Sequence, residues 1–174
     1  QEKRRPTAKV YTIEIQKVNP LSGLQTEEQI MDRWETGTDD PVVSICCTAY
    51  NHEPYIEDAI VGFLRQETDF PFEILIHDDA STDQTAAVIE KYHRLYPNII
   101  KPILQKENKQ SKGYQPNLDF NFLRAKGEFI AVCEGDDYWV DARKLMKQVQ
   151  FLRENQDFIA AYHTVVVVDE HDRE

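Results

Sequence analysis

The chain has 174 residues and a formal net charge of −11, from 20 Lys and Arg residues against 31 Asp and Glu residues. This length fits one domain with a sizeable core, and the 41% hydrophobic content favours a folded protein over a disordered one. The acid excess argues against a nucleic-acid partner and against electrostatic adsorption on an anionic membrane. A phosphate-bearing ligand would therefore need a source of positive charge besides Lys and Arg.

The sequence predicts an intracellular protein without disulfides. No apolar stretch reaches the ~18 residues of a membrane span, and the basic residues 1–6 are not followed by the apolar core of a signal peptide. Cys46 and Cys47 are adjacent in a strand-like run and Cys133 is the third cysteine, a pattern that indicates buried free thiols. We expect a cytoplasmic location, and a peripheral position at the inner face of the cell membrane stays open.

Residues 1–40 read as an N-terminal extension. Alternating apolar residues predict a short strand over residues 10–15. Thr26, followed three residues later by Gln29, predicts a capped short helix whose apolar side ends at Trp34. Whether this extension packs on the sheet, covers a sheet edge or mediates a homodimer stays open.

Strands and helices alternate from residue 41 onward. Leu95 and Leu118 are expected on core-facing sides of helices, and Gly127 is expected as a helix C-cap. The alternation predicts an α/β fold with a mostly parallel sheet and helices on both faces, whose strand C-terminal ends share one ligand-binding edge. The predicted strands cover residues 42–47, 72–76, 99–104, 129–133 and 159–168, with helices in the segments between them.

Polar runs follow three of the predicted strands, at residues 48–53, 77–83 and 134–139. An Asp-Asp pair alone is usually a helix cap or a solvated turn. Two acidic clusters on one sheet edge are different, because crowded carboxylates repel unless a cation or a hydrogen-bonding ligand lies between them. Oxygen ligands suit Mg²⁺ or Mn²⁺, which can bridge a diphosphate and act as a Lewis acid. Tyr50 is either a stacking partner for a nucleobase or a core residue.

These residues together resemble the nucleotide-binding half of family 2 glycosyltransferases, the inverting enzymes of the Rossmann-like GT-A fold. The resemblance covers residues 42–168 in the family's order and spacing. It implies a domain over residues 41–174 that binds a nucleotide-diphospho-sugar. The motifs that carry it are Tyr50-Asn51 after the first strand, residues 73–83, and residues 125–130 leading into Glu134-Gly135-Asp136-Asp137.

The resemblance implies roles for residues at the nucleotide. Thr48 matches the position that touches uracil or ribose, and Tyr50 is the candidate for base stacking. Asp79 matches the carboxylate that binds the uracil N3–H, with Asp78 as its neighbour. Asp83 matches an acid that we expect to cap a helix.

The resemblance also implies a metal-dependent donor site. Glu134 to Asp136 falls on the family's Asp-x-Asp motif, although Glu134 replaces the usual Asp. Asp136 and Asp137 are therefore the metal candidates, with Mn²⁺ or Mg²⁺ as cofactor, and Asp136 also serves the ribose or diphosphate. Lys112 lies roughly where some members place a basic residue near phosphate.

The implied activity is transfer of a sugar, with inversion, from a UDP-sugar to a hydroxyl of a saccharide or lipid-linked saccharide in bacterial surface polysaccharide biosynthesis. Inversion needs a general base. We expect that base beyond Glu174, in a chain that is C-terminally truncated, because Asp169 and His171 read as a solvated tail.

Two other function classes stay open. One is a non-catalytic nucleotide-binding or interaction module. The other is a receiver-like phosphoacceptor domain, suggested by His77-Asp78-Asp79. In receivers, however, the acidic pair follows the first strand, and the matching Lys is missing here.

Overall fold

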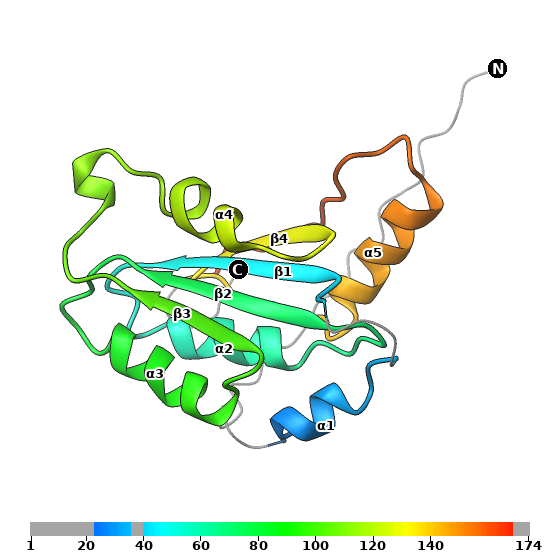
Figure 1. The fold of residues 1–174 in the computed structure, drawn as a ribbon, viewed down its shortest axis with the longest axis horizontal. Helices are drawn as coiled ribbons and strands as arrows, with labels where there is room; N and C mark the ends of the chain where they lie inside the picture. Colours follow the sequence, from blue (N-terminus) through cyan, green and yellow to red (C-terminus); the bar gives the residue numbers. More distant parts are fainter. Residues whose placement is uncertain (1–22, 36–39, 169–174) are drawn as a thin grey trace.

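The computed structural model describes residues 23–35 and 40–168, and its centre is a parallel sheet with the strand order β3-β2-β1-β4 (Figure 1). The strand that the sequence predicts over residues 10–15, and the tail residues Asp169 and His171, lie outside the described residues. The predicted α/β class with a parallel sheet is confirmed. The strands are β1 (Val43–Ala49), β2 (Phe72–Asp78), β3 (Ile100–Leu104) and β4 (Phe129–Glu134).

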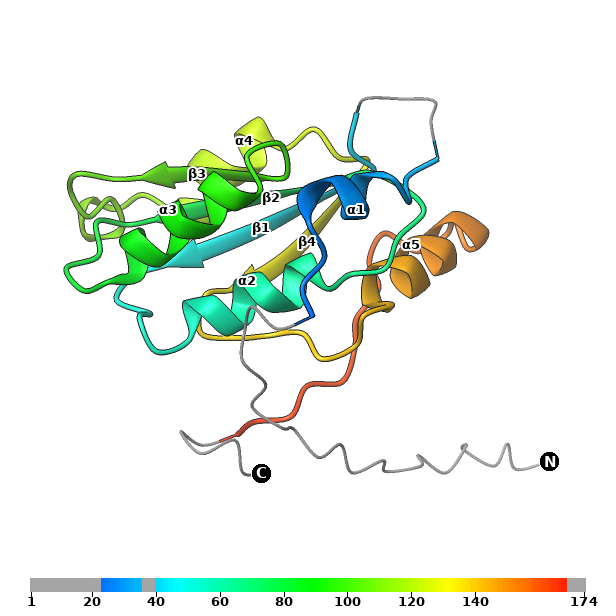
Figure 2. The same ribbon diagram turned by 90° about the horizontal axis from the view of Figure 1, so that it is seen from below.

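Helices cover both faces of this sheet. The helices α2 and α3 lie on one face, and η2 with α4 lies on the other (Figures 1 and 2). Pro102 lies in β3 at the edge of the sheet, where a missing backbone donor is tolerated. The helices are α1 (Glu27–Met31), α2 (Ile56–Leu64), α3 (Thr85–Leu95), a 3₁₀ turn η1 (Gln110–Lys112), a π turn η2 (Asn117–Asn121), α4 (Phe122–Arg124) and α5 (Lys144–Glu154).

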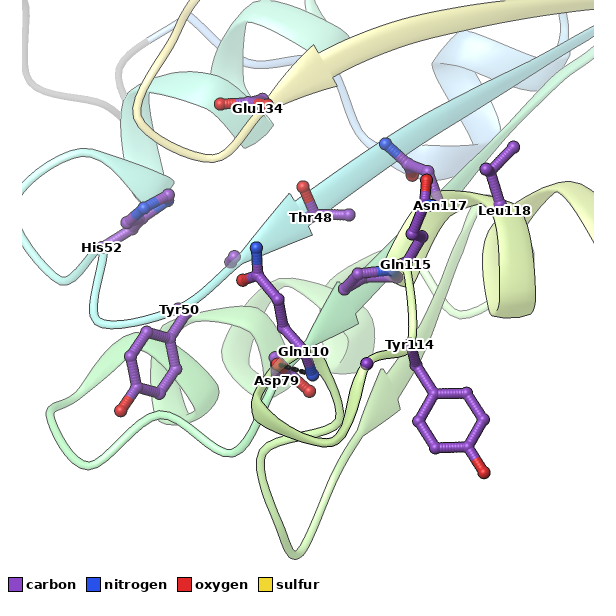
Figure 3. A pocket seen from close by; sticks show the side chains of 13 residues that line it. Thr48, Tyr50, His52, Asp79, Gln110, Tyr114, Gln115, Asn117, Leu118 and Glu134 are labelled. Carbon is purple, nitrogen blue, oxygen red and sulfur yellow. Dashed lines mark hydrogen bonds between the residues drawn. The ribbon is translucent and has the colours of Figure 1, made fainter.

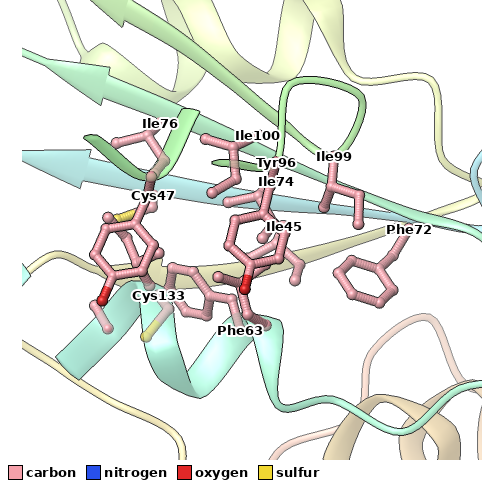
Figure 4. Packing of buried hydrophobic residues seen from close by; sticks show 14 of the residues in the cluster. Ile45, Cys47, Phe63, Phe72, Ile74, Ile76, Tyr96, Ile99, Ile100 and Cys133 are labelled. Atoms are coloured by element: carbon pink, nitrogen blue, oxygen red, sulfur yellow. The ribbon is translucent and has the colours of Figure 1, made fainter. Parts of the chain in front are cut away.

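The main core lies between the sheet and α2. Ile56, Ile60 and Phe63 lie on the apolar stripe of α2 and are fully buried, as the i, i+4, i+7 spacing predicts. They pack beneath β1 and β2, whose strands are buried on both faces (Figure 4). This core holds the two central strands rigidly and thereby fixes where their C-terminal ends lie.

The helix predicted near residue 26 is confirmed, together with its capping box. Thr26 Oγ1 accepts a hydrogen bond from the Gln29 backbone N–H at 3.2 Å, and Gln29 Oε1 accepts one from the Thr26 N–H at 2.9 Å. Ile30 is fully buried. Trp34 packs edge-to-face on Phe72 with ring centroids 5.5 Å apart, so this part of the extension joins the core.

The three cysteines are free and buried, as predicted. Burial raises the pKa of the Cys46 and Cys133 thiols to about 12, which keeps them protonated and unreactive. Within residues 23–35 and 40–168, no helix has the length and apolar character to cross a bilayer.

Four expectations about the elements are wrong. Residues 159–168 form no strand and Ile159 is fully exposed, because β-propensity alone yields a strand only where a pairing partner exists. Leu95 and Leu118 are about half exposed, at 53% and 51%, and Leu118 lines a cavity instead of the core. Gly127 is not a left-handed C-cap: a Cβ there would lie 2.4 Å from the Ser44 backbone N, so close packing on β1 requires glycine.

Candidate functional site

A cavity of about 580 Å³ opens at the C-terminal ends of β1, β2 and β4, the edge where the sequence places a ligand site (Figure 3). Its walls come from these strand ends and from the loop after β3. The lining residues are Thr48, Ala49, Tyr50, His52, Asp79, Gln110, Gly113, Tyr114, Gln115, Pro116, Asn117, Leu118 and Glu134.

The end of β1 contributes Thr48 and Tyr50 to the cavity. Tyr50 is 42% exposed, so it is not a core residue and its ring is open to a ligand. The chain then turns at Asn51, which adopts a left-handed φ of 55°. The Asn51 N–H donates to Ser81 Oγ at 2.9 Å, and Asn51 Oδ1 accepts from the Thr82 N–H at 2.8 Å. The loops after β1 and β2 are therefore bound to each other and position Thr48 and Tyr50 beside Asp79.

Asp79 lies at the end of β2, and its carboxylate anchors the opposite wall. One oxygen accepts the Lys109 N–H at 2.6 Å and the other accepts the Gln110 N–H at 3.0 Å. These bonds fold the loop after β3 back over the strand ends, and Gln110 reaches from that loop into the cavity (Figure 3). Each carboxylate oxygen has a second lone pair, so Asp79 can still accept a hydrogen bond from a ligand.

Two predicted acids belong to turns instead of the cavity lining. Asp78 is buried and accepts hydrogen bonds from the Ser81 hydroxyl and, at 3.1 Å, from the Ser81 N–H, which closes the turn after β2. Asp83 accepts from the Thr85 N–H at 3.0 Å and caps α3, as expected. It also accepts the Glu53 N–H at 3.0 Å and so ties this turn to the segment that leads into α2.

Lys112 does not line the cavity either. Its ammonium pairs with Glu107, and Lys109 pairs with the same carboxylate at 2.7 Å. The two lysines lower the pKa of Glu107 to about 2. The lining contains neither Lys nor Arg, and Lys109 and Lys112 already pair with Glu107.

The acidic turn after β4 lies at another side of the cavity. Glu134 lines it, while Asp136 and Asp137 are exposed to solvent. Asp136 Oδ2 lies 3.9 Å from Nε2 of His52. Across the described ranges, no three His, Cys, Asp or Glu side chains converge as a complete metal site. The exposed carboxylates fit a Mg²⁺ or Mn²⁺ ion that takes one or two protein ligands and completes its shell with phosphate and water oxygens.

The sequence does not predict several of the residues that line the cavity: His52, Gln110, Tyr114, Gln115, Asn117 and Leu118. It predicts Lys112 as a phosphate contact, whereas Gln110, Tyr114 and Gln115 of the same segment form the cavity wall. One signal could have indicated that the loop after β3 forms a wall of the cavity. The carboxylate of Asp79 is buried and therefore requires N–H donors close by, which this loop provides.

Comparison of the sequence with known protein families shows which family this chain belongs to. The profile described as Glycosyl transferase family 2 matches residues 44–173, which include β1 except for Val43, the strands β2, β3 and β4, and every residue that lines the cavity. The chain belongs to glycosyl transferase family 2. This membership excludes the receiver-like alternative and confirms the resemblance drawn from the strand-end motifs.

Relatives in several bacteria share the family region. An uncharacterized protein of Mycobacterium tuberculosis is 43% identical over 128 residues, 74% of this chain and 36% of that protein. An uncharacterized glycosyltransferase of Nostoc is 31% identical over 131 residues, 75% of this chain and 38% of the relative. The chain thus spans little more than a third of the length of these relatives.

A solved structure shares the fold as well. The crystal structure of residues 1–349 of Staphylococcus aureus TarS in complex with UDP matches with a TM-score of 0.54 and 30% identity, over 66% of this chain and 32% of that one. TarS, which was also solved with UDP-GlcNAc, is a poly(ribitol-phosphate) beta-N-acetylglucosaminyltransferase. The predicted GT-A fold is therefore confirmed.

Proposed function

We propose that this chain forms the donor site of a glycosyltransferase that takes a sugar from a UDP-sugar and transfers it to a hydroxyl acceptor with inversion. The observation that carries the proposal is the cavity at the strand ends, where Thr48, Tyr50 and Asp79 meet. The UDP complex of TarS, a family member with the same fold, supports the choice of nucleotide.

The base is bound between the ends of β1 and β2. Asp79 is fixed by two backbone N–H groups and retains free lone pairs, so it accepts the N3–H of uracil. A hydrogen bond to a buried carboxylate discriminates well, because a base without an N–H at that position would leave the carboxylate facing another acceptor. The half-exposed ring of Tyr50 provides a stacking surface beside it.

The diphosphate lies toward the acidic turn after β4. Asp136 and Asp137 are the residues that would hold Mn²⁺ or Mg²⁺ there. When bound, such an ion supplies Lewis-acid stabilisation of the leaving diphosphate. The protein's own contribution is to orient the two carboxylates beside the cavity. Because the lining holds no Lys or Arg, no ammonium or guanidinium group of the lining competes with the metal ion for these carboxylates.

We place the acceptor among saccharides and lipid-linked saccharides of the bacterial surface, and the general base in sequence beyond Glu174. The named activity of TarS on poly(ribitol-phosphate) supports an acceptor of this kind. Free buried thiols fit the reducing cytoplasm, with the inner face of the membrane as the site of a lipid-linked acceptor.

Calorimetry tests the donor site directly. We expect UDP to bind in the presence of Mn²⁺, to bind much more weakly after chelation with EDTA, and to compete with a UDP-sugar. CDP serves as the base control: its cytosine N3 is an acceptor that would face the Asp79 carboxylate, so CDP is expected to bind at least tenfold more weakly. The proposal would be refuted by a chain that binds no UDP with or without Mn²⁺.

A further inference from the structure

The backbone of His52 is anchored on both sides. Its N–H donates to Thr85 Oγ1 at 2.9 Å, and its carbonyl accepts the N–H groups of Tyr55 at 2.9 Å and Ile56 at 2.8 Å, where α2 begins. The preceding residue, Asn51, has the left-handed φ that turns the chain out of β1. The backbone position from which the imidazole projects is therefore fixed by the scaffold.

The imidazole packs against the acidic turn after β4. A Cβ at Gly135 would lie 2.9 Å from His52 Nδ1, so the turn and the ring touch at a position that admits no side chain. His52 Nδ1 is buried without a hydrogen-bond partner. On the other side of the ring, Asp136 Oδ2 lies 3.9 Å from Nε2. A carboxylate accepts hydrogen bonds, so Nε2 is the ring nitrogen that is placed to donate to Asp136.

His52 is also unusual among the residues that line the cavity. It is the one basic side chain in a lining that contains no Lys or Arg, and its side chain is 23% exposed. Burying Nδ1 without a hydrogen-bond partner costs stability, so packing alone would favour an apolar side chain at this position. A role for the second ring nitrogen, Nε2, explains why the residue is a histidine.

We propose that His52 is a positioning residue for the donor site, and this inference rests on the proposed function. Closing the gap of 3.9 Å by about 1 Å lets the Nε2–H donate to Asp136 Oδ2. The bond fixes one carboxylate oxygen of Asp136 and turns the other toward a divalent cation on the diphosphate. Hydrogen bonds that orient metal-binding side chains in this way change metal affinity by roughly 10–100-fold.

The test measures the apparent affinity of Mn²⁺ by titrating MnCl₂ into the protein in saturating UDP. His52→Phe keeps a ring without an N–H, and His52→Gln restores an N–H donor. We expect about a 10–100-fold weaker Mn²⁺ affinity for H52F and partial recovery for H52Q. The melting temperature without ligand should stay within about 2 °C of wild type in both, because Nδ1 has no partner to lose. His163→Gln, at an exposed histidine outside the cavity, is the matched control.

A double-mutant cycle shows whether His52 acts through Asp136. In an Asp136→Asn background, H52F should change Mn²⁺ affinity less than twofold. Full additivity would overturn the inference, and so would an H52F protein with wild-type Mn²⁺ affinity. A parallel loss of melting temperature and affinity in H52F and H52Q would show a structural role only. If wild type itself binds no UDP with Mn²⁺, the proposed function fails instead, whatever the variants do.

Discussion

Replacing Asp79 with Asn separates the two tasks that this carboxylate performs. In the structure its two oxygens accept the backbone N–H groups of Lys109 and Gln110, and the proposed uracil N3–H is a third donor. Asn has one acceptor oxygen and an NH₂ group that only donates. It can therefore satisfy part of the loop or the ligand, but it cannot replace the carboxylate for both.

The magnitude follows from the charge on the acceptor. A hydrogen bond to a charged group contributes about 1.5–3 kcal/mol, and about 1.4 kcal/mol corresponds to a factor of ten in affinity. We therefore expect D79N to weaken UDP binding about 10–100-fold in calorimetry with Mn²⁺. Because one loop N–H loses its acceptor, hydrogen exchange in residues 106–113 should become faster.

The matched control loosens the same loop without touching the carboxylate. Asn108 donates to the Asp79 carbonyl at 3.2 Å and accepts the Ser111 N–H at 2.7 Å. Asn108→Ala should accelerate exchange in the loop while UDP affinity falls only about threefold. Equal losses of affinity in D79N and N108A would mean that Asp79 acts only by holding the loop, and unchanged affinity in D79N would refute the reasoning altogether.

Three further predictions concern stability. Glu73 is buried and accepts hydrogen bonds from Ser44 Oγ, from the Lys126 N–H and from Lys101 Nζ, which outweigh the effect of burial and lower its pKa. E73Q should lower the free energy of unfolding, measured in urea at pH 7, by about 1.5–3 kcal/mol. This difference from wild type should shrink as the pH falls below about 4.5. The control E128Q, at an exposed ion pair, should change the free energy of unfolding by under about 1 kcal/mol. Ala80 has a left-handed φ of 63°, which costs about 1–2 kcal/mol, so A80G should gain about 0.5–1 kcal/mol after the entropy of glycine is deducted, and a lower melting temperature would contradict this. Burial lowers the pKa of His77, so only the unfolded chain takes up this proton as the pH falls below about 6.5. Wild type should therefore lose stability between pH 7 and pH 5 and H77F should lose less, while identical pH profiles would contradict the assignment.

The fold was predictable where local pattern and tertiary burial agree. The stripe of α2 and the capping box of α1 are local signals, and both correspond to residues buried in the core. Residues 159–168 show the opposite case, because a run of β-branched residues becomes a strand only beside a partner, and the pattern carries no information about that partner. Gly127 likewise resembles a helix cap in the sequence, but glycine is required there by close packing against Ser44, 83 residues away in the sequence. The Gly127 N–H donates to Ser44 Oγ at 2.8 Å.

The part of the site that could be predicted is the part formed by residues at the C-terminal ends of parallel strands, where such sheets bind ligands. Thr48 lies near the end of β1, Tyr50 and Asp79 follow directly on β1 and β2, and all three line the cavity. Asp78 is adjacent to Asp79, yet its side chain faces the turn, because successive residues at a strand end point to opposite sides. Gln110 and the residues after it could not be placed, since their position depends on a long-range bond to Asp79.

The acid excess of the chain acquires a structural meaning at this cavity. The lysines Lys109 and Lys112 both pair with Glu107, and the lining itself offers a carboxylate at each end but no Lys or Arg. An anionic donor then meets repulsion unless N–H donors and a cation compensate the charge. In the proposed function Asp136 would hold the cation beside the diphosphate, which would make the orientation of that one carboxylate a control point for the donor site. His52 is the residue that the fold holds against this point, with its backbone bonded to Thr85 and its ring in contact with Gly135.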